Sequence, residues 1–170
     1  MPKRKTRKGG QKVRYDLLEK KGAICVHLND CAASVFYALG YTDYETSIYL
    51  AQHSTGGLYG KSEVLPLLKL AYGDISWEEL TPDSLNNNDA TLALFSYGKT
   101  AHYIAVFKQN NTLFAFDPQL QRIEPLETYL QTFENVRGIY FINSNLRERG
   151  DNLVTREIID EVFSPDLSLG

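Results

Sequence analysis

The sequence predicts an α+β fold in which N-terminal helices pack on a mostly antiparallel sheet of about four strands. The first half predicts helices, because apolar residues recur at intervals of three and four positions between residues 31 and 73. From residue 90 onwards the pattern changes to short runs of β-branched and aromatic residues, which Gly, Asn or Pro separate. Helices followed by strands are typical of α+β domains, and a length of 170 residues fits one domain.

The first predicted helix covers residues 31–39, CAASVFYAL. Its apolar side chains recur at helical spacing: Val35, Phe36 and Leu39. Asn29 or Asp30 is expected as its N-cap, and Gly40 as its C-cap. This assignment places Cys31 in the first turn of a helix that is otherwise buried.

Two more helices are expected before the strands begin. One covers residues 42–53, with Thr42 or Asp43 as its cap. The other covers residues 61–73, with Ser62 as its cap. The glycine-rich segment STGGLYG between them predicts a turn. The apolar residues of the third helix share one face: Val64, Leu67, Leu68 and Ala71.

The second half of the chain predicts strands and short helices. Four runs read as strands: residues 90–98, 101–109, 112–118 and 138–145. The segment PLETYLQTF between the last two predicts a short helix. A last amphipathic helix, TREIIDEVF, is expected to lie outside the core.

Charge and composition divide the chain into three parts. Residues 1–14 are expected to form a basic flexible tail, residues 15–145 the folded domain, and residues 146–170 a charged helical extension. The tail holds seven of the 18 Lys and Arg residues and no acidic residue, so the rest carries 11 basic against 21 acidic residues, a net charge of −10. Basic segments attract phosphates and acidic protein surfaces. Residues 3–14 are therefore a candidate site for an acidic partner or nucleic acid, and a solvated or nuclear-targeting tail is the alternative.

Targeting and cofactor signals are absent from the sequence. No apolar run follows the N-terminal charges, and no window approaches the ~18 to 20 apolar residues that cross a bilayer. Two cysteines do not make a disulfide scaffold. We expect an intracellular protein of the cytoplasm, the nucleus or a virion, without membrane association. No phosphate loop or dinucleotide fingerprint occurs, so no cofactor and no metal are expected.

Three residues predict nucleophilic chemistry. A catalytic thiol needs an environment that favours its anion, and the first turn of a helix, where Cys31 lies, supplies one. It also needs a histidine to take its proton and a polar group to orient that histidine. His102 opens one predicted strand and Asp117 closes the next.

The turn between these two strands sets their register. Asn110 and Asn111 predict a two-residue hairpin turn. Paired residue numbers then add up to 221, so that Ile104 opposes Asp117 and His102 opposes Gln119. His102 and Asp117 therefore share a face as diagonal neighbours, within reach of a side-chain contact.

Other interpretations of these residues stay open. A histidine at a strand start is often a surface or core residue, and an aspartate before proline is often a turn former. Cys25, His27 and Cys31 could bind zinc, although no fourth ligand is evident. Cys25 and Cys31 could also form a disulfide, against which the expected compartment argues. His53 is expected to cap or end its helix.

The order of these motifs resembles that of papain-like cysteine peptidases, above all the bacteriocin-processing type and papain-fold toxin domains. The chain carries DCAASVFYALGY, GGLYGKSEVLPLLKLAYG, HYIAVFK and FAFDPQ in that order, and the likeness spans about residues 24–142. Transglutaminase cores share the order of Cys, His and Asp-Pro but usually carry a tryptophan beside the cysteine. The only tryptophan here is Trp77.

The resemblance implies a papain-like fold and a role for each residue of the site. Cys31 would be the nucleophile, His102 the general base and acid, and Asp117 or Gln119 the group that orients the histidine. The oxyanion would be held by the Cys31 backbone N–H and an upstream polar side chain. These families usually place a glutamine six residues before the cysteine, and here Cys25 stands there, so Asn29 or His27 is the substitute. Ala32 also replaces a common glycine.

Two functions follow as expectations. The resemblance implies a cysteine hydrolase that cleaves a peptide or isopeptide bond, or deamidates glutamine, in a protein or peptide substrate. The alternative is a non-catalytic papain-like component of a virion or complex, anchored by its basic tail. The composition of that tail is similar to N-terminal tails of proteins from large DNA viruses.

Overall fold

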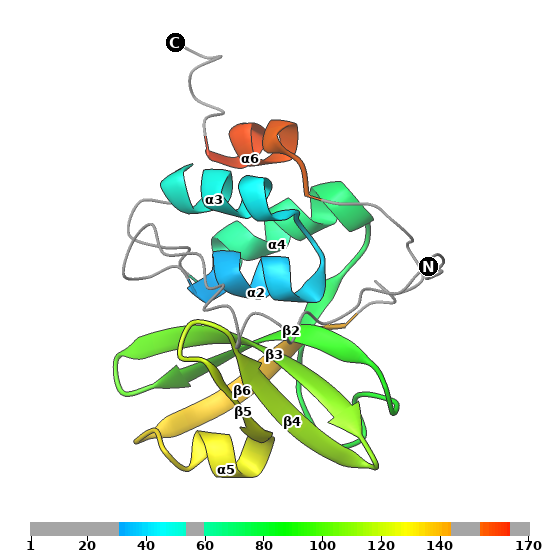
Figure 1. Cartoon of the computed structure of the whole chain (residues 1–170), viewed down its shortest axis with the longest axis vertical. Coiled ribbons are helices and arrows are strands. Elements are labelled where there is room, and N and C mark those ends of the chain that lie inside the picture. Colours follow the sequence, from blue (N-terminus) through cyan, green and yellow to red (C-terminus); the bar gives the residue numbers. More distant parts are fainter. Residues whose placement is uncertain (1–30, 54–59, 144–153, 164–170) are drawn as a thin grey trace.

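The computed structural model describes residues 31–53, 60–143 and 154–163, and these residues form a layered α+β structure (Figure 1). Four helices lie on one side of the sheet: α2 (Cys31–Leu39), α3 (Tyr44–His53), α4 (Gly60–Tyr72) and α6 (Arg156–Phe163). The short helix α5 (Leu126–Leu130) lies on the opposite side. The predicted α+β class is therefore confirmed.

The sheet is antiparallel throughout and has six strands in the order β1-β6-β2-β3-β4-β5. Its strands are β1 (Ser76–Glu79), β2 (Ala90–Tyr97), β3 (Thr100–Gln109), β4 (Thr112–Asp117), β5 (Arg122–Pro125) and β6 (Val136–Asn143). The expectation of about four strands was wrong, because β1 and β5 were missed. Both are edge strands of four residues, SWEE and RIEP, whose composition lacks the apolar runs that predicted the other four.

The core has one part on each face of the sheet. Towards α2, α3, α4 and α6, alternate residues of β3 pack against the helices, among them Tyr103, Ala105 and Phe107. Ile104 and Val106 point the other way and pack with Leu126 and Tyr129 of α5. The alternation follows from the two-residue period of a strand.

Helix α2 begins and ends as the sequence predicts. At its end Gly40 has a φ of 84°, a left-handed conformation that costs glycine little. The N–H of Tyr41 donates to the Phe36 carbonyl at 2.8 Å, and the N–H of Gly40 donates to that of Tyr37 at 3.1 Å. These two bonds make a Schellman motif, which confirms Gly40 as the C-cap. The predicted N-cap, Asn29 or Asp30, lies outside the described residues.

The predicted N-cap is confirmed for α3 and wrong for α4. Asp43 Oδ1 accepts the Thr46 N–H at 2.8 Å, so Asp43 caps α3. The alternative cap, Thr42, instead bonds the buried Ser47 side chain. Helix α4 begins at Gly60, two residues before Ser62, so the expectation that Ser62 caps it was wrong. The predicted glycine-rich turn lies in residues 54–60, of which 54–59 are outside the described part.

The last helix belongs to the core, contrary to expectation. Ile159 of α6 has no exposed surface, and Val154 is only 1% exposed. The N–H of Val154 donates to the Tyr41 carbonyl at 2.8 Å, and Tyr49 of α3 donates its hydroxyl to Asp160 at 2.6 Å. The many charges of residues 146–163 concealed these two buried apolar positions. None of the described helices combines the length and the apolar character needed to cross a membrane.

Candidate active site

The structure gives the three predicted site residues well-defined positions in the fold. Cys31 is the first residue of α2, which packs against β3. His102 is the third residue of β3, and Asp117 is the last residue of β4. The β3–β4 hairpin therefore brings His102 and Asp117 together, and the start of α2 supplies the thiol.

The hairpin has the predicted register. Gln109 pairs with Thr112 and Ala105 pairs with Phe116, so paired numbers add up to 221. Asn110 and Asn111 have φ angles of 51° and 62°, as a type I′ turn requires. Regular pairing ends at Ala105–Phe116, and the chain turns again after Asp117.

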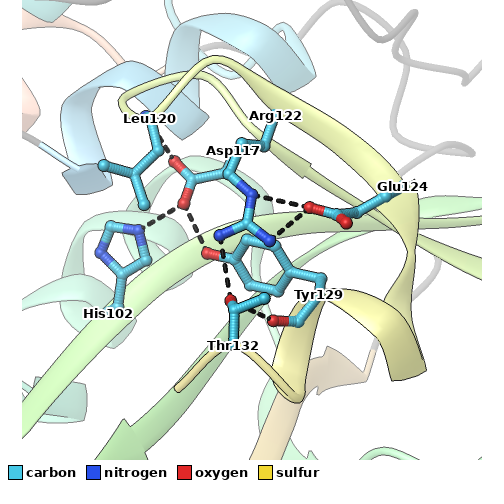
Figure 2. A network of polar contacts seen from close by, with 7 residues as sticks. All are labelled: His102, Asp117, Leu120, Arg122, Glu124, Tyr129 and Thr132. Carbon is cyan, nitrogen blue, oxygen red and sulfur yellow. Dashed lines mark hydrogen bonds and ion pairs between the residues drawn. The ribbon is translucent and has the colours of Figure 1, made fainter.

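Asp117 is the most enclosed group of the site (Figure 2). It has no exposed surface, and three donors reach its carboxylate. His102 Nε2 lies 2.8 Å from Oδ2, the Tyr129 hydroxyl donates to the same oxygen at 2.5 Å, and the Leu120 N–H donates to Oδ1 at 3.0 Å. Burial would raise the pKa of Asp117, but these donors and the His102 charge hold it below its usual range. Asp117 is therefore a buried, ionised carboxylate.

His102 lies between Asp117 and Cys31. It is 8% exposed, and burial alone would lower its pKa. Hydrogen bonds and charge interactions with Asp117 and Cys31 outweigh burial and raise the pKa of His102 to about 9. Because Nε2 is committed to Asp117, Nδ1 is the nitrogen that remains for Cys31. At neutral pH His102 is an imidazolium held between two acidic partners.

Cys31 has the features that thiol chemistry needs. It is a free cysteine, and the residue is half-buried. Its backbone belongs to the first turn of a nine-residue helix, where N–H groups lack intrahelical acceptors and favour an anion. An imidazolium and a helix start thus act on the same sulfur.

The remaining predicted site residues lie in a turn or outside the described residues. Gln119 is half-buried in the turn at residues 118–121 and is not strand-paired opposite His102, since β4 ends at Asp117. Asn29 and His27, the expected oxyanion residues, lie outside the described residues, as does Cys25. The part of the chain that the structure describes holds no cluster of three metal-ligating side chains. Cys31 is not in a disulfide.

His53 has the structural role expected of it. It is the last residue of α3, and its Nδ1 lies 3.0 Å from the Tyr49 carbonyl oxygen. Its Nε2 lies 3.8 Å from Asp160 Oδ1, in a pair that is partly exposed. The chain thus contains a second Asp–His pair at the surface, which is a natural control for the buried one.

Sequence reasoning missed Tyr129. Its contact with Asp117 requires the β4–β5 hairpin, which pairs Asp117 with Arg122, and then the return of the chain through α5. Since β5 was not predicted, nothing in the spacing singled out Tyr129 among eleven tyrosines. No model of a known protein family matches the sequence. A search of curated proteins found no match either.

Proposed function

We propose that the chain is a papain-like thiol hydrolase that cleaves a peptide or isopeptide bond, or deamidates glutamine. The observation that carries the proposal is the position of His102, buried between the Asp117 carboxylate and the Cys31 thiol. A thiol, an imidazole and an orienting carboxylate in this order are the parts of a cysteine-hydrolase triad.

The proposed reaction has two halves. In the proposed resting site His102 already holds the thiol proton on Nδ1, and the Cys31 thiolate attacks the carbonyl carbon of the substrate. The tetrahedral intermediate collapses to a thioester when the imidazolium returns the proton to the leaving nitrogen, which departs as an amine or as ammonia. Water then attacks the thioester while His102 accepts its proton. The sulfur leaves as the thiolate, which releases the acid and restores the pair with the protonated His102.

The described residues supply one oxyanion donor to this mechanism. The Cys31 backbone N–H, in the first turn of α2, would face the developing negative charge. Removal of one such donor typically costs about 10²–10³ in rate. The second donor is assigned by resemblance to Asn29 or His27.

An activated ester tests the proposal without knowledge of the natural substrate. We would follow 4-nitrophenyl acetate hydrolysis and the mass of the protein in a Cys25→Ala background, where Cys31 is the remaining thiol. We expect transient acetylation of Cys31 and repeated turnover, both lost in Cys31→Ala and strongly reduced in His102→Ala. His53→Ala, which removes the surface histidine, should retain both.

Two outcomes would refute the hydrolase. Stable acetylation of Cys31 without release would describe a reactive thiol that cannot hydrolyse its thioester. Absence of Cys31 acetylation would describe a non-catalytic domain, and the partner of the basic residues 3–14 would become the question. With turnover established, peptide, isopeptide and glutamine substrates would identify the bond.

A further inference from the structure

Tyr129 lies outside the three residues of the proposed triad but contacts one of them directly. It is fully buried on α5, and its hydroxyl donates to Asp117 Oδ2 (Figure 2). The same oxygen faces His102 Nε2. Asp117 Oδ2 thus has two side-chain partners, Tyr129 from helix α5 and His102 from strand β3.

The three donors to Asp117 fix its carboxylate in both position and rotation. Leu120 N–H bonds Oδ1, whereas His102 and Tyr129 bond Oδ2. With Leu120 and His102 alone, each oxygen would have a single partner. The phenol adds a second partner on the oxygen that carries the histidine.

The ring of Tyr129 is itself held in place. The Arg122 guanidinium carbon lies 4.6 Å from the ring centroid, and the Phe95 ring packs edge-on at 5.8 Å. Arg122 Nε donates to Glu124 at 2.6 Å and Arg122 Nη1 donates to Thr132 Oγ1 at 3.0 Å. Glu124 thereby neutralises Arg122, while Asp117 pairs with His102.

We propose that Tyr129 is a positioning residue of this site, which fixes the Asp117 carboxylate against His102 through its hydroxyl. The inference rests on the proposed function, because Tyr129 positions a catalytic group only if His102 takes part in a reaction. Tyr129 would act through Asp117 and would not contact the substrate.

The sign of the expected effect follows from the groups that surround the pair. Asp117 is contacted by His102, which lies on β3, and by Tyr129, which lies on α5. His102 is also close to Cys31. The charge of Arg122 lowers the pKa of Tyr129, and Tyr97 raises it. The phenol stabilises the ionised carboxylate, so its removal raises the pKa of Asp117. Protonation of Asp117, which ends its ion pair with His102, then occurs at higher pH.

Nuclear magnetic resonance of the His102 ring measures this transition directly. We would titrate wild type, Tyr129→Phe and the matched control Tyr41→Phe from acid to neutral pH. Tyr41 is also fully buried, but its hydroxyl bonds Thr91 and Leu92 of β2. We expect Tyr129→Phe to move the acid transition of His102 upward by about one pH unit, and Tyr41→Phe to leave it unchanged.

A double-mutant comparison separates positioning from a general structural role. In an Asp117→Asn background, Tyr129→Phe should change the His102 titration no further, because the group through which it acts is gone. If Tyr129→Phe does not fold, Arg122→Met, which frees the ring, should give a smaller shift of the same sign. An acid transition that stays at its wild-type pH in either folded variant would overturn the proposal.

The titration is read on His102 and does not require turnover. A shift in Tyr129→Phe together with absent ester turnover would refute the hydrolase and leave the link between Tyr129 and Asp117 intact. Ester turnover together with an unshifted titration would support the hydrolase and refute the role of Tyr129.

Discussion

The Asp117→Asn variant should reverse the tautomer of His102. The Leu120 N–H donates to Oδ1, so the carbonyl of the new amide should stay on that side and its NH₂ should take the place of Oδ2. This NH₂ then donates to His102 Nε2, which must become an acceptor. The ring proton moves to Nδ1, the nitrogen that faces Cys31, and His102 can no longer take the thiol proton.

The same substitution should also remove most of the positive charge of His102. Burial continues to lower the pKa of His102, while the bond and charge of Asp117 that raise it are gone. At pH 7.5 a pKa of about 9 keeps ~97% of His102 protonated, whereas a pKa at its ordinary 6.5 leaves ~10%. The imidazolium population should therefore fall about tenfold.

Nitrogen-15 chemical shifts of the His102 ring report both its charge and its tautomer. The matched control is Asp160→Asn, which breaks the surface pair with His53 and should leave His102 unchanged. If His102 in Asp117→Asn keeps its wild-type pKa, or keeps its proton on Nε2 when neutral, the assignment of Asp117 as its orienting group is wrong.

Three further predictions concern stability. His102, whose pKa rises from 6.5 to about 9 on folding, contributes stability that is present below pH 6.5 and is lost as the pH rises through 9, on the order of 3 kcal/mol. Urea unfolding at pH 6 and 9.5 should show this fall in unfolding free energy in wild type but not in His102→Ala. An equal fall in both proteins would contradict the raised pKa of His102. Ile159→Ala should cost about 2–5 kcal/mol in unfolding free energy, whereas Ile158→Ala, at its half-buried neighbour, should cost less; equal small costs would mean that α6 is not part of the core. Gly40→Ala should cost about 1 kcal/mol in the same assay, because its φ of 84° strains an L-residue, and an unchanged midpoint would contradict the Schellman cap.

The sequence predicted those parts of the site that depend on local signals. Asn110 and Asn111 specify a two-residue turn, and such a turn determines the register of both strands that it joins. That register was sufficient to place His102 and Asp117 on one face. The local apolar spacing of residues 31–39 also predicted α2, and Gly40 predicted its C-cap.

The parts that were missed depend on contacts between distant segments. The edge strand β5 is held by its pairing with β4, and its sequence RIEP carries no strand pattern of its own. Tyr129 reaches Asp117 only because that strand and α5 bring the chain back. Helix α6 packs against α3 and α4, which lie far earlier in the chain, and the amphipathic pattern of TREIIDEVF does not show which helices its apolar face meets.

The pH dependence of iodoacetamide alkylation at Cys31 tests the central claim most directly. In a Cys25→Ala background, the rate would be measured in wild type, His102→Ala and the control His53→Ala. The Cys31–His102 pair predicts fast labelling below pH 7 that His102→Ala abolishes and His53→Ala preserves. Labelling that follows an ordinary thiol, with a pKa of about 8.5, and is equal in all three proteins would contradict it.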